Sequence, residues 1–442
     1  MSNSIDNKEQ IEEHLCEEEV SLDKVYKFPT EIVVKKINNI YLVIYTEGCL
    51  WLVFNEQEFE VFKMLQKNLS ITQVMEHFNE DVVINTITQI EAKKFERPII
   101  KKETNKNMYI YLTNNCNERC NHCYMYSGEF KFEELTVSQW KKVISDFKNC
   151  GGKGITFTGG EVTVYKGFEE IIKYTHNIGI HTTVLTNGVL WDQNLIESIY
   201  KYIDEIQVSI DGYDRESYIN VRNFDGFENA IETIVSFYKL GTRVSMAVTP
   251  LYEGIDCFVE KFEKFALSFI SKYPNIFIKI SFELLNGRNI KSDDVKNLNY
   301  ENKIRKLVES IYPNYYIETF VLNYKDSNIR ENCGFGEISI APNGDVYWCN
   351  RIHELESSYN IKNTSMIDII KKSEEIKEGT NVKHSQVCSK CDIKYICGGG
   401  CRMKYPDIID CNKKYWENRC TSEYKEKLYE RMIASNEYFY LE

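Results

Sequence analysis

The chain has 442 residues, a length that suggests two or three domains. Hydrophobic residues make up 43% of it and aromatic residues 13%, which excludes a largely disordered protein. The formal net charge of -12 argues against nucleic-acid binding, because contacts to phosphates need clustered Lys and Arg.

The sequence contains no apolar run of about 18 residues, so it predicts no transmembrane helix and no membrane partner. Residues 1–20 are polar and acidic and lack the basic and apolar parts of a signal peptide, which predicts a cytoplasmic protein. Disulfides are rare in that reducing compartment. The 15 cysteines are therefore expected to bind metal.

The chain opens with an acidic segment, 1–22, that we expect to be flexible. Region 23–98 continues with three short apolar stretches and then three helical patterns. The stretches are 31–34, 40–45 and 49–54, and the helices are 56–67, 70–78 and 82–95, with Ser70 as a helix N-cap. This order predicts a small winged-helix-like module with Trp51, Phe54 and Phe59 in its core. The polar stretch 101–107 predicts a linker.

Strands and helices alternate from Met108 onward, which predicts a parallel α/β sheet over 104–312. The predicted strands are 109–113, 154–158, 181–186, 205–210, 243–248 and 277–283. Six strand–helix units are fewer than the eight of a closed barrel, so we expect a partial (β/α)6 barrel. After residue 320 the alternation stops and cysteines become frequent, which predicts a separate metal-bound domain over 320–432.

Cys116, Cys120 and Cys123 directly follow the first predicted strand of this barrel, where such folds place reactive loops. Three thiolates at this spacing can bind three irons of a 4Fe-4S cluster and leave the fourth iron open to the amino and carboxylate groups of a cofactor. The alternative is a zinc site with His122 as its fourth ligand.

Followed by Tyr124, the three cysteines resemble the C-x3-C-x2-C signature of the radical S-adenosylmethionine (radical SAM) superfamily. Later motifs extend the resemblance. Three lie at the ends of successive predicted strands: Gly159-Gly160-Glu161, Asn187-Gly188, and Ser209 with Asp211. Arg222 follows the last of them in a Tyr-x3-Arg context. Alone, each motif is weak, because a Gly-Gly or Asn-Gly pair is usually only a turn.

The resemblance implies that S-adenosylmethionine binds among these residues. The backbone of Gly159, Gly160 and Glu161 would hold its methionine amino group, and Ser209 and Arg222 would contact its ribose and carboxylate. Tyr124 and Asn187 are assigned to the same cofactor site, and loop 286–288 to its adenine side. An electron from a flavodoxin, ferredoxin or reductase would then release a 5′-deoxyadenosyl radical that removes a hydrogen atom from the substrate.

Seven cysteines near the C-terminus have the most specific spacing in the chain. They are Cys333, Cys349, Cys388, Cys391, Cys397, Cys401 and Cys420, with Gly344 five residues before Cys349. The pattern resembles the SPASM extension of radical SAM enzymes, which holds two auxiliary 4Fe-4S clusters, so three clusters are expected in all. A zinc ribbon is the alternative, but seven ligands exceed a single site.

In that family one auxiliary cluster would take Cys388, Cys391, Cys397 and Cys420, and the other Cys333, Cys349 and Cys401. The second set lacks one ligand. Either Cys411 supplies it or the site stays open for a substrate thiolate, as thioether-forming relatives suggest. Sulfatase-maturating relatives carry an Asp where this chain has Asn350, which disfavours that activity because an amide is no general base.

The N-terminal module resembles the element with which peptide-modifying enzymes bind the leader of a precursor peptide by adding a strand to a sheet. A DNA-binding regulator with an iron–sulfur sensor is the rival, but residues 1–100 hold 18 acidic and 10 basic side chains, which fits phosphate binding poorly. A structural docking domain is a third reading. Almost the whole chain, residues 24–430, thus resembles sactipeptide and ranthipeptide maturases, which implies that it forms a cysteine thioether in a ribosomally made peptide. A carbon–carbon or carbon–oxygen crosslink is the alternative, and binding without catalysis is a third possibility.

Overall fold

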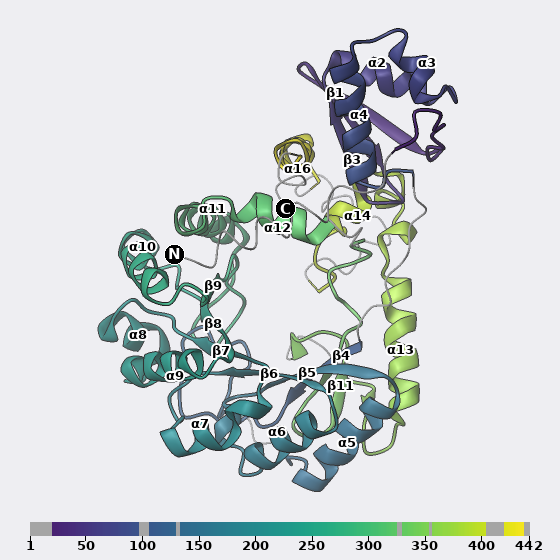
Figure 1. Cartoon of the computed structure of the whole chain (residues 1–442). Helices are drawn as coiled ribbons and strands as arrows, with labels where there is room; N and C mark the ends of the chain where they lie inside the picture. Colours follow the sequence, from purple (N-terminus) through teal and green to yellow (C-terminus); the bar gives the residue numbers. More distant parts are fainter. Residues whose placement is uncertain are drawn as a thin grey trace. The chain divides into compact units, whose positions relative to one another are not determined.

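The computed structural model describes residues 20–96, 106–129, 133–324, 329–352, 356–403 and 420–436. These residues divide into two compact units, each assembled from separate parts of the chain (Figure 1). One unit holds the described parts of Met1–Lys102, Asn314–Cys333 and Thr380–Glu442, and the other holds those of Glu103–Pro313 and Gly334–Gly379. Segment 320–432, expected to be one domain, therefore contributes to both units. Most of the predicted flexible segment 1–22 lies outside the described residues.

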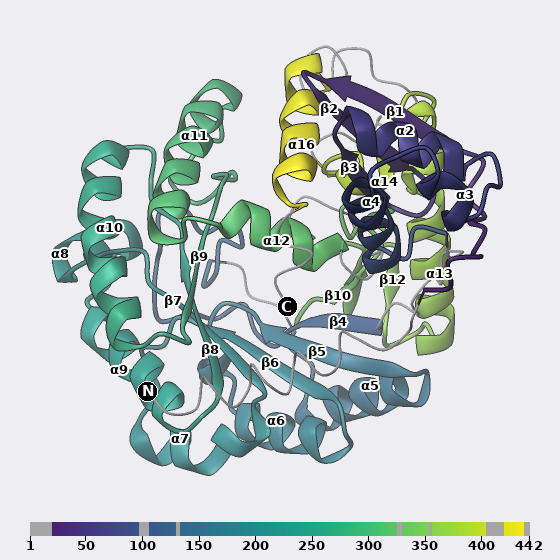
Figure 2. The ribbon, with the colours of Figure 1, turned by 45° about the horizontal axis from the view of Figure 1, so that its top comes forward.

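The larger unit is built on six parallel strands in sequence order, which confirms the predicted α/β class. They are β4 (Lys106–Tyr111), β5 (Gly152–Thr158), β6 (His181–Thr186), β7 (Glu205–Ser209), β8 (Arg243–Val248) and β9 (Phe277–Ile280). The intervening helices are α5 (Val137–Asn149), α6 (Phe168–Asn177), α7 (Gln193–Ile199), α8 (Arg215–Arg222), α9 (Phe227–Lys239) and α10 (Ile255–Lys272). These helices lie along the outer side of the sheet, and α11 (Asp294–Ile311) follows β9 (Figures 1 and 2).

Three short strands extend this sheet beyond β4, and the sequence pattern missed them. They are β10 (Ile338–Ile340), β11 (Asp345–Tyr347) and β12 (Tyr359–Asn360). Strand β10 runs parallel to β4, while β11 and β12 are antiparallel to their neighbours. Helix α13 (Met366–Gly379) contacts both α5 and β10. Strand β4 starts at Lys106, so the last two residues of the predicted linker 101–107 belong to the sheet, and 101–105 lie outside the described residues.

The N-terminal module has the predicted order of three strands and three helices. The strands β1 (Ile32–Ile37), β2 (Ile40–Tyr45) and β3 (Leu50–Phe54) pair antiparallel, and α2 (Glu56–Leu65), α3 (Ile71–Met75) and α4 (Glu80–Ala92) follow. Ser70 is the N-cap of α3, as predicted, with Gln73 completing a capping box. Phe54 is buried in the core of this module, whereas Phe59 is only half-buried and stacks on Tyr41. Assignment to the winged-helix class stays a prediction.

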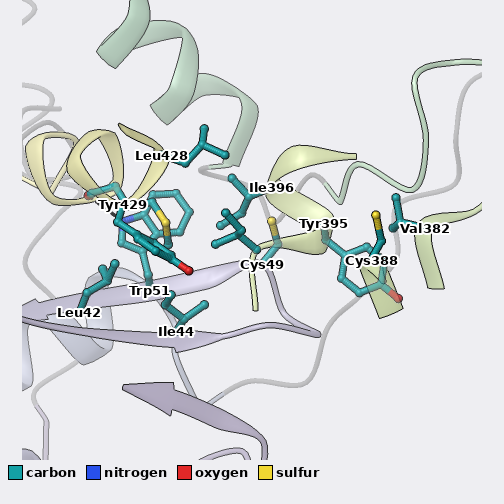
Figure 3. Packing of buried hydrophobic residues seen from close by; sticks show 12 residues of the cluster. Leu42, Ile44, Cys49, Trp51, Val382, Cys388, Tyr395, Ile396, Leu428 and Tyr429 are labelled. Atoms are coloured by element: carbon teal, nitrogen blue, oxygen red, sulfur yellow. Dashed lines mark hydrogen bonds between the residues drawn. The ribbon is translucent and has the colours of Figure 1, made fainter. Parts of the chain in front are cut away.

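The other face of strands β2 and β3 packs against the C-terminal part of the same unit (Figure 3). Trp51 is buried in this core and donates its indole N–H to the Met432 carbonyl at 2.9 Å. The C-terminal partners are residues around α14 (Lys394–Cys397) and α16 (Ser422–Ala434), while α12 (Tyr315–Tyr324) contacts α16. The expectation that Trp51 is a core residue is confirmed, but the core it fills is shared with a segment more than 300 residues away.

Lys93, which caps the C-terminal end of α4, predicts a pH dependence of stability. Its ammonium donates to Asn436 Oδ1 at 2.5 Å, and burial lowers its pKa from 10.5 to about 7. In the unfolded chain Lys93 is protonated below about pH 10.5, whereas in the folded chain it is protonated only below about pH 7. The free energy of unfolding therefore falls as the pH drops through that window. K93M should lack this loss. Urea unfolding should show that the stability of K93M relative to the wild type increases as the pH is lowered from 10 to 7. A difference in free energy of unfolding that stays constant with pH would contradict the assignment.

Candidate cluster and cofactor site

Cys116, Cys120 and Cys123 lie on the loop that follows β4, and all three are half-buried. Backbone N–H groups point at two of the sulfurs: that of Glu118 donates to Cys116 Sγ at 3.4 Å and that of Ser127 to Cys123 Sγ at 3.5 Å. Burial raises the pKa of the Cys116 thiol to about 12 and moves that of Cys120 in the same direction. Such thiols stay protonated until a metal displaces the proton, and donors aimed at sulfur stabilise the thiolate.

This donor set fits an iron–sulfur cluster. Among the residues that the structure describes, no three His, Cys, Asp or Glu side chains converge tightly enough to hold a single metal ion. A 4Fe-4S cluster distributes its thiolates over separate irons, so its cysteines need not converge on one point. Cys116, Cys120 and Cys123 would hold the cluster and leave one iron without a protein ligand.

Gly159 and Gly160, at the end of β5, allow a very close approach between two segments of backbone. A Cβ on Gly160 would stand 2.2 Å from the Asn115 carbonyl oxygen, and one on Gly159 would stand 2.4 Å from that of Thr113. The approach lets the Gly160 N–H donate to Thr113 at 2.7 Å and the Glu161 N–H donate to Asn115 at 2.9 Å. The resemblance implies that the backbone here holds the methionine amino group of the cofactor. In the structure the two glycines also make room for the backbone that leads into Cys116.

The Glu161 carboxylate is buried and joins β5 to the end of β6. It accepts from Thr186 Oγ1 at 2.6 Å and from the Asn187 N–H at 2.7 Å, and also from the hydroxyl and N–H of Thr163. Burial raises its pKa, and these four donors oppose the rise. Asn187 in turn donates to Asn117 Oδ1 at 2.8 Å, beside Cys116. Glu161 and Asn187 thus reach the cysteine loop from two neighbouring strands.

Arg222, the last residue of α8, is buried under the cysteine loop. Its guanidinium donates to Glu118 Oε2 at 2.5 Å and to Asp211 Oδ2 at 2.8 Å. Ser209, the last residue of β7, is half-buried two positions before Asp211. Tyr124 packs with Tyr109 and Tyr347 against a small buried cluster of this unit. The structure therefore brings the predicted cofactor residues to one edge of the sheet, with Arg222 already paired to two carboxylates.

The loop after β9 clamps the cysteine loop, a role that its sequence did not predict. Arg288 donates to the Cys120 carbonyl at 2.9 Å and to the Ser127 carbonyl at 2.7 Å, and its backbone N–H donates to Cys123. It also pairs with Glu129. A Cβ on Gly287 would stand 2.6 Å from the His122 carbonyl oxygen. Loop 286–288 therefore holds the cysteine loop, and its assignment to the adenine side of the cofactor stays a prediction. The sequence signal for the clamp was an arginine beside a glycine after a strand.

Replacing Arg288 with alanine removes its side-chain donors and should loosen the cysteine loop, so cluster loading should fall several-fold. R288K keeps the charge but lacks the fork that reaches two carbonyls, and should recover little. Iron per chain after anaerobic reconstitution measures the effect. R243A, which removes an arginine side chain that is 79% exposed, is the control and should load normally. Equal loading in all four proteins would exclude the clamp.

The C-terminal cysteines that the family would assign to one cluster lie together in the smaller unit. Cys388, Cys397 and Cys420 are electrostatic neighbours, as are Cys391 and Cys420. Burial raises the pKa of Cys388 to about 11, and the Cys391 N–H donates to the Cys388 carbonyl. These four thiols fit one cluster. Cys333 accepts from the N–H of Arg402 at 3.3 Å, next to Cys401. Cys349 belongs to the other unit, near Tyr109 and Tyr124, and Cys411 lies outside the described residues.

Comparison with known proteins identifies the barrel. Residues 110–264 match the model of the Radical SAM superfamily. Sporulation killing factor maturation protein SkfB of Bacillus subtilis is 32% identical over 32% of this chain, which is only 34% of SkfB. Antilisterial bacteriocin subtilosin biosynthesis protein AlbA of the same organism is 26% identical over 78% of this chain and 75% of its own length. An AdoMet-dependent heme synthase of Oleidesulfovibrio alaskensis is 24% identical over 66% of this chain and 81% of its own.

Solved structures agree on the fold. Streptococcus suis SuiB bound to S-adenosylmethionine superposes with a TM-score of 0.53 at 15% identity, covering 85% of this chain and 96% of SuiB. Native anSMEcpe with bound AdoMet gives 0.57 at 17% identity, covering 75% and 99%. In the part of the chain that the structure describes, no helix is long and apolar enough to cross a membrane. Residues 110–264 thus form a radical SAM domain, and most of the chain is similar in sequence to AlbA and in fold to SuiB.

Proposed function

We propose that this chain is an enzyme that modifies a ribosomally made precursor peptide and closes a thioether between a cysteine sulfur and a carbon of that peptide. The radical SAM domain supports the reaction class. Two relatives carry the names of a maturation protein and a bacteriocin biosynthesis protein, and SuiB has been solved bound to precursor peptide SuiA. Heme synthases are also among the relatives, so the proposal that the substrate is a peptide rests on a further observation.

That observation is the shared core of the N-terminal module and the cysteine-bearing segment. Lys35 of β1 pairs with Asp392 at 3.0 Å, next to Cys391, and Glu47 pairs with Lys394 at 2.6 Å. Tyr429 of α16 donates to the same Asp392 carboxylate at 2.9 Å. A module that shares a core with the cysteine-bearing segment suits leader binding better than it suits an independent regulatory domain. The edge strands of its sheet suit the binding of an extended peptide.

Bound S-adenosylmethionine and a reduced 4Fe-4S cluster at Cys116, Cys120 and Cys123 would supply the radical that removes a hydrogen atom. The peptide carbon loses that hydrogen atom, the cysteine thiol loses its proton, and one electron leaves as the carbon–sulfur bond forms. Cysteines of the C-terminal segment would hold the two auxiliary clusters that accept this electron. An auxiliary cluster one ligand short would offer its iron to the substrate thiolate, which deprotonates the sulfur and holds it for bond formation. A flavodoxin, ferredoxin or reductase would supply the electron for the first step.

Co-expression with a short cysteine-containing peptide encoded beside the gene tests the proposal. The peptide should lose two hydrogens, and its cysteine should no longer react with an alkylating reagent. A peptide that loses two hydrogens while every thiol still alkylates would move the product to a carbon–carbon or carbon–oxygen crosslink. An unchanged peptide in the presence of abundant 5′-deoxyadenosine would argue for a different substrate class. C116A should leave the peptide unmodified in every case.

A further inference from the structure

Two buried carboxylates, one from the cysteine loop and one from the end of β7, lie around a single guanidinium. The Glu118 and Asp211 side chains are 1% and 2% exposed, and the Arg222 side chain is 6% exposed. Arg222 donates to Glu118 through Nη1 and to Asp211 through Nε. Its Nη2 forms an ion pair with the same Asp211 oxygen at 2.8 Å, so all three guanidinium nitrogens contact these two side chains.

The remaining carboxylate oxygens are also occupied. Glu118 Oε1 accepts from the Tyr218 hydroxyl at 2.7 Å, and Asp211 Oδ1 accepts from the Thr249 N–H at 2.6 Å. Glu118 Oε2 lies 3.5 Å from the Cys120 sulfur. Burial lowers the pKa of Arg222, but the charges of Asp211 and Glu118 outweigh this and raise it. The three side chains form a satisfied network in contact with a cysteine of the loop.

The end of α8 that carries Arg222 is also tied to the cysteine loop by uncharged contacts. The Asn121 N–H donates to the Val221 carbonyl at 2.9 Å, and the Asn121 amide donates to the Asn220 carbonyl at 2.9 Å. Asn223, in the left-handed conformation with φ of 51°, donates to the Arg119 carbonyl. The helix end and the loop are therefore joined directly by hydrogen bonds on either side of Arg222.

We infer that Arg222 is a positioning residue: it is the internal countercharge that lets Glu118 of the cysteine loop and Asp211 remain buried, and it does not bind the carboxylate of the cofactor. Turning the guanidinium toward a cofactor would leave a buried carboxylate without its arginine countercharge next to anionic thiolates, which is strongly unfavourable. This departs from the role that the family resemblance implies for Arg222. It rests on the cluster proposed at Cys116, Cys120 and Cys123.

Charge restoration tests the inference. One net negative charge remains on the three side chains in the wild type, two remain in R222Q, and one remains in E118Q/R222Q. The full-length proteins are reconstituted anaerobically with iron and sulfide. The first readout is the EPR signal of the reduced cluster that S-adenosylmethionine perturbs, together with its midpoint potential. The second is the dissociation constant of S-adenosylmethionine for the loaded protein.

R222Q should load this cluster several-fold less than the wild type, with a more negative midpoint potential in the loaded fraction. E118Q/R222Q should regain most of the loading, and its affinity for S-adenosylmethionine should stay within about threefold of the wild type. R243Q is the surface control and should match the wild type in every measurement.

Normal loading and potential in R222Q, with affinity for S-adenosylmethionine weakened by about tenfold or more, would instead assign Arg222 to the cofactor and overturn the inference. A double variant no better than R222Q, including one that fails to fold, would overturn it as well. Absence of any such cluster from the wild type is a separate result, which would refute the proposed function.

Discussion

Replacing Gly160 with alanine should prevent the cysteine loop from binding its cluster and destabilise the chain by about 1–3 kcal/mol. The new methyl group would stand 2.2 Å from the Asn115 carbonyl oxygen and 2.8 Å from that of Asn114. Both obstacles are backbone atoms, so no side chain can rotate away. The clash can be relieved only if the start of the loop moves. That movement breaks the hydrogen bonds that the Gly160 and Glu161 N–H groups donate to the Thr113 and Asn115 carbonyls. Cys116 follows immediately and would be displaced.

The measurement is iron per chain after reconstitution, together with urea unfolding of the metal-free protein. G379A is the matched control: a Cβ at this last residue of α13 meets nothing within 4 Å. It should load normally and be neutral or slightly stabilised, since alanine favours a helix over glycine. If G160A loaded its cluster as well as G379A, the close approach would have no role in holding the loop.

Replacing Trp51 with alanine should cost about 3–5 kcal/mol and lower the iron bound by the C-terminal cysteines. The indole is 1% exposed and fills the core shared by β2, β3 and the segment that carries Cys388, Cys391 and Cys397 (Figure 3). Its removal leaves a large cavity and the Met432 carbonyl without its donor. Because the cavity borders the cysteine segment, the damage should reach the auxiliary cluster.

F54A provides the comparison on the same strand. Phe54 is equally buried but faces the core of the N-terminal module, away from the cysteines. Both variants should unfold at a lower urea concentration than the wild type, and both should keep the EPR signal that responds to S-adenosylmethionine. Only W51A should lose iron from the auxiliary cluster. W51F should be intermediate, because it keeps most of the packing but loses the bond to Met432. Equal iron loss in W51A and F54A would show that the effect is general unfolding.

The parallel strands were predictable from sequence because each carries consecutive or alternating apolar residues and alternates with a helical segment along the chain. Strands β6 and β8 have the predicted bounds, and β2 does in the N-terminal module. The α/β class followed from their alternation with amphipathic helices. Strands β10 to β12 are two or three residues long and have no periodicity to detect. They exist because β4 offers an unpaired edge, which is a property of the folded sheet.

The cysteines were recognisable because ligand spacing is local. The groups that support them were not, because their partners are distant in sequence: Arg288 acts on Cys120 and Arg222 acts on Glu118. A sequence shows that an arginine is present but not which carboxylate it will pair with in the folded chain. The same limit hid the two faces of β3, where Trp51 and Phe54 are both apolar yet belong to different cores.

The most direct test of the account is metal and product analysis of the oxygen-free, reconstituted chain beside the variant C116A/C120A/C123A. The wild type should contain iron and sulfide for three clusters, about twelve irons, and form 5′-deoxyadenosine from S-adenosylmethionine and dithionite. The variant should contain about four irons fewer and form none. Zinc in place of iron and sulfide, or the same product from both proteins, would contradict the assignment of a radical-generating cluster to these three cysteines.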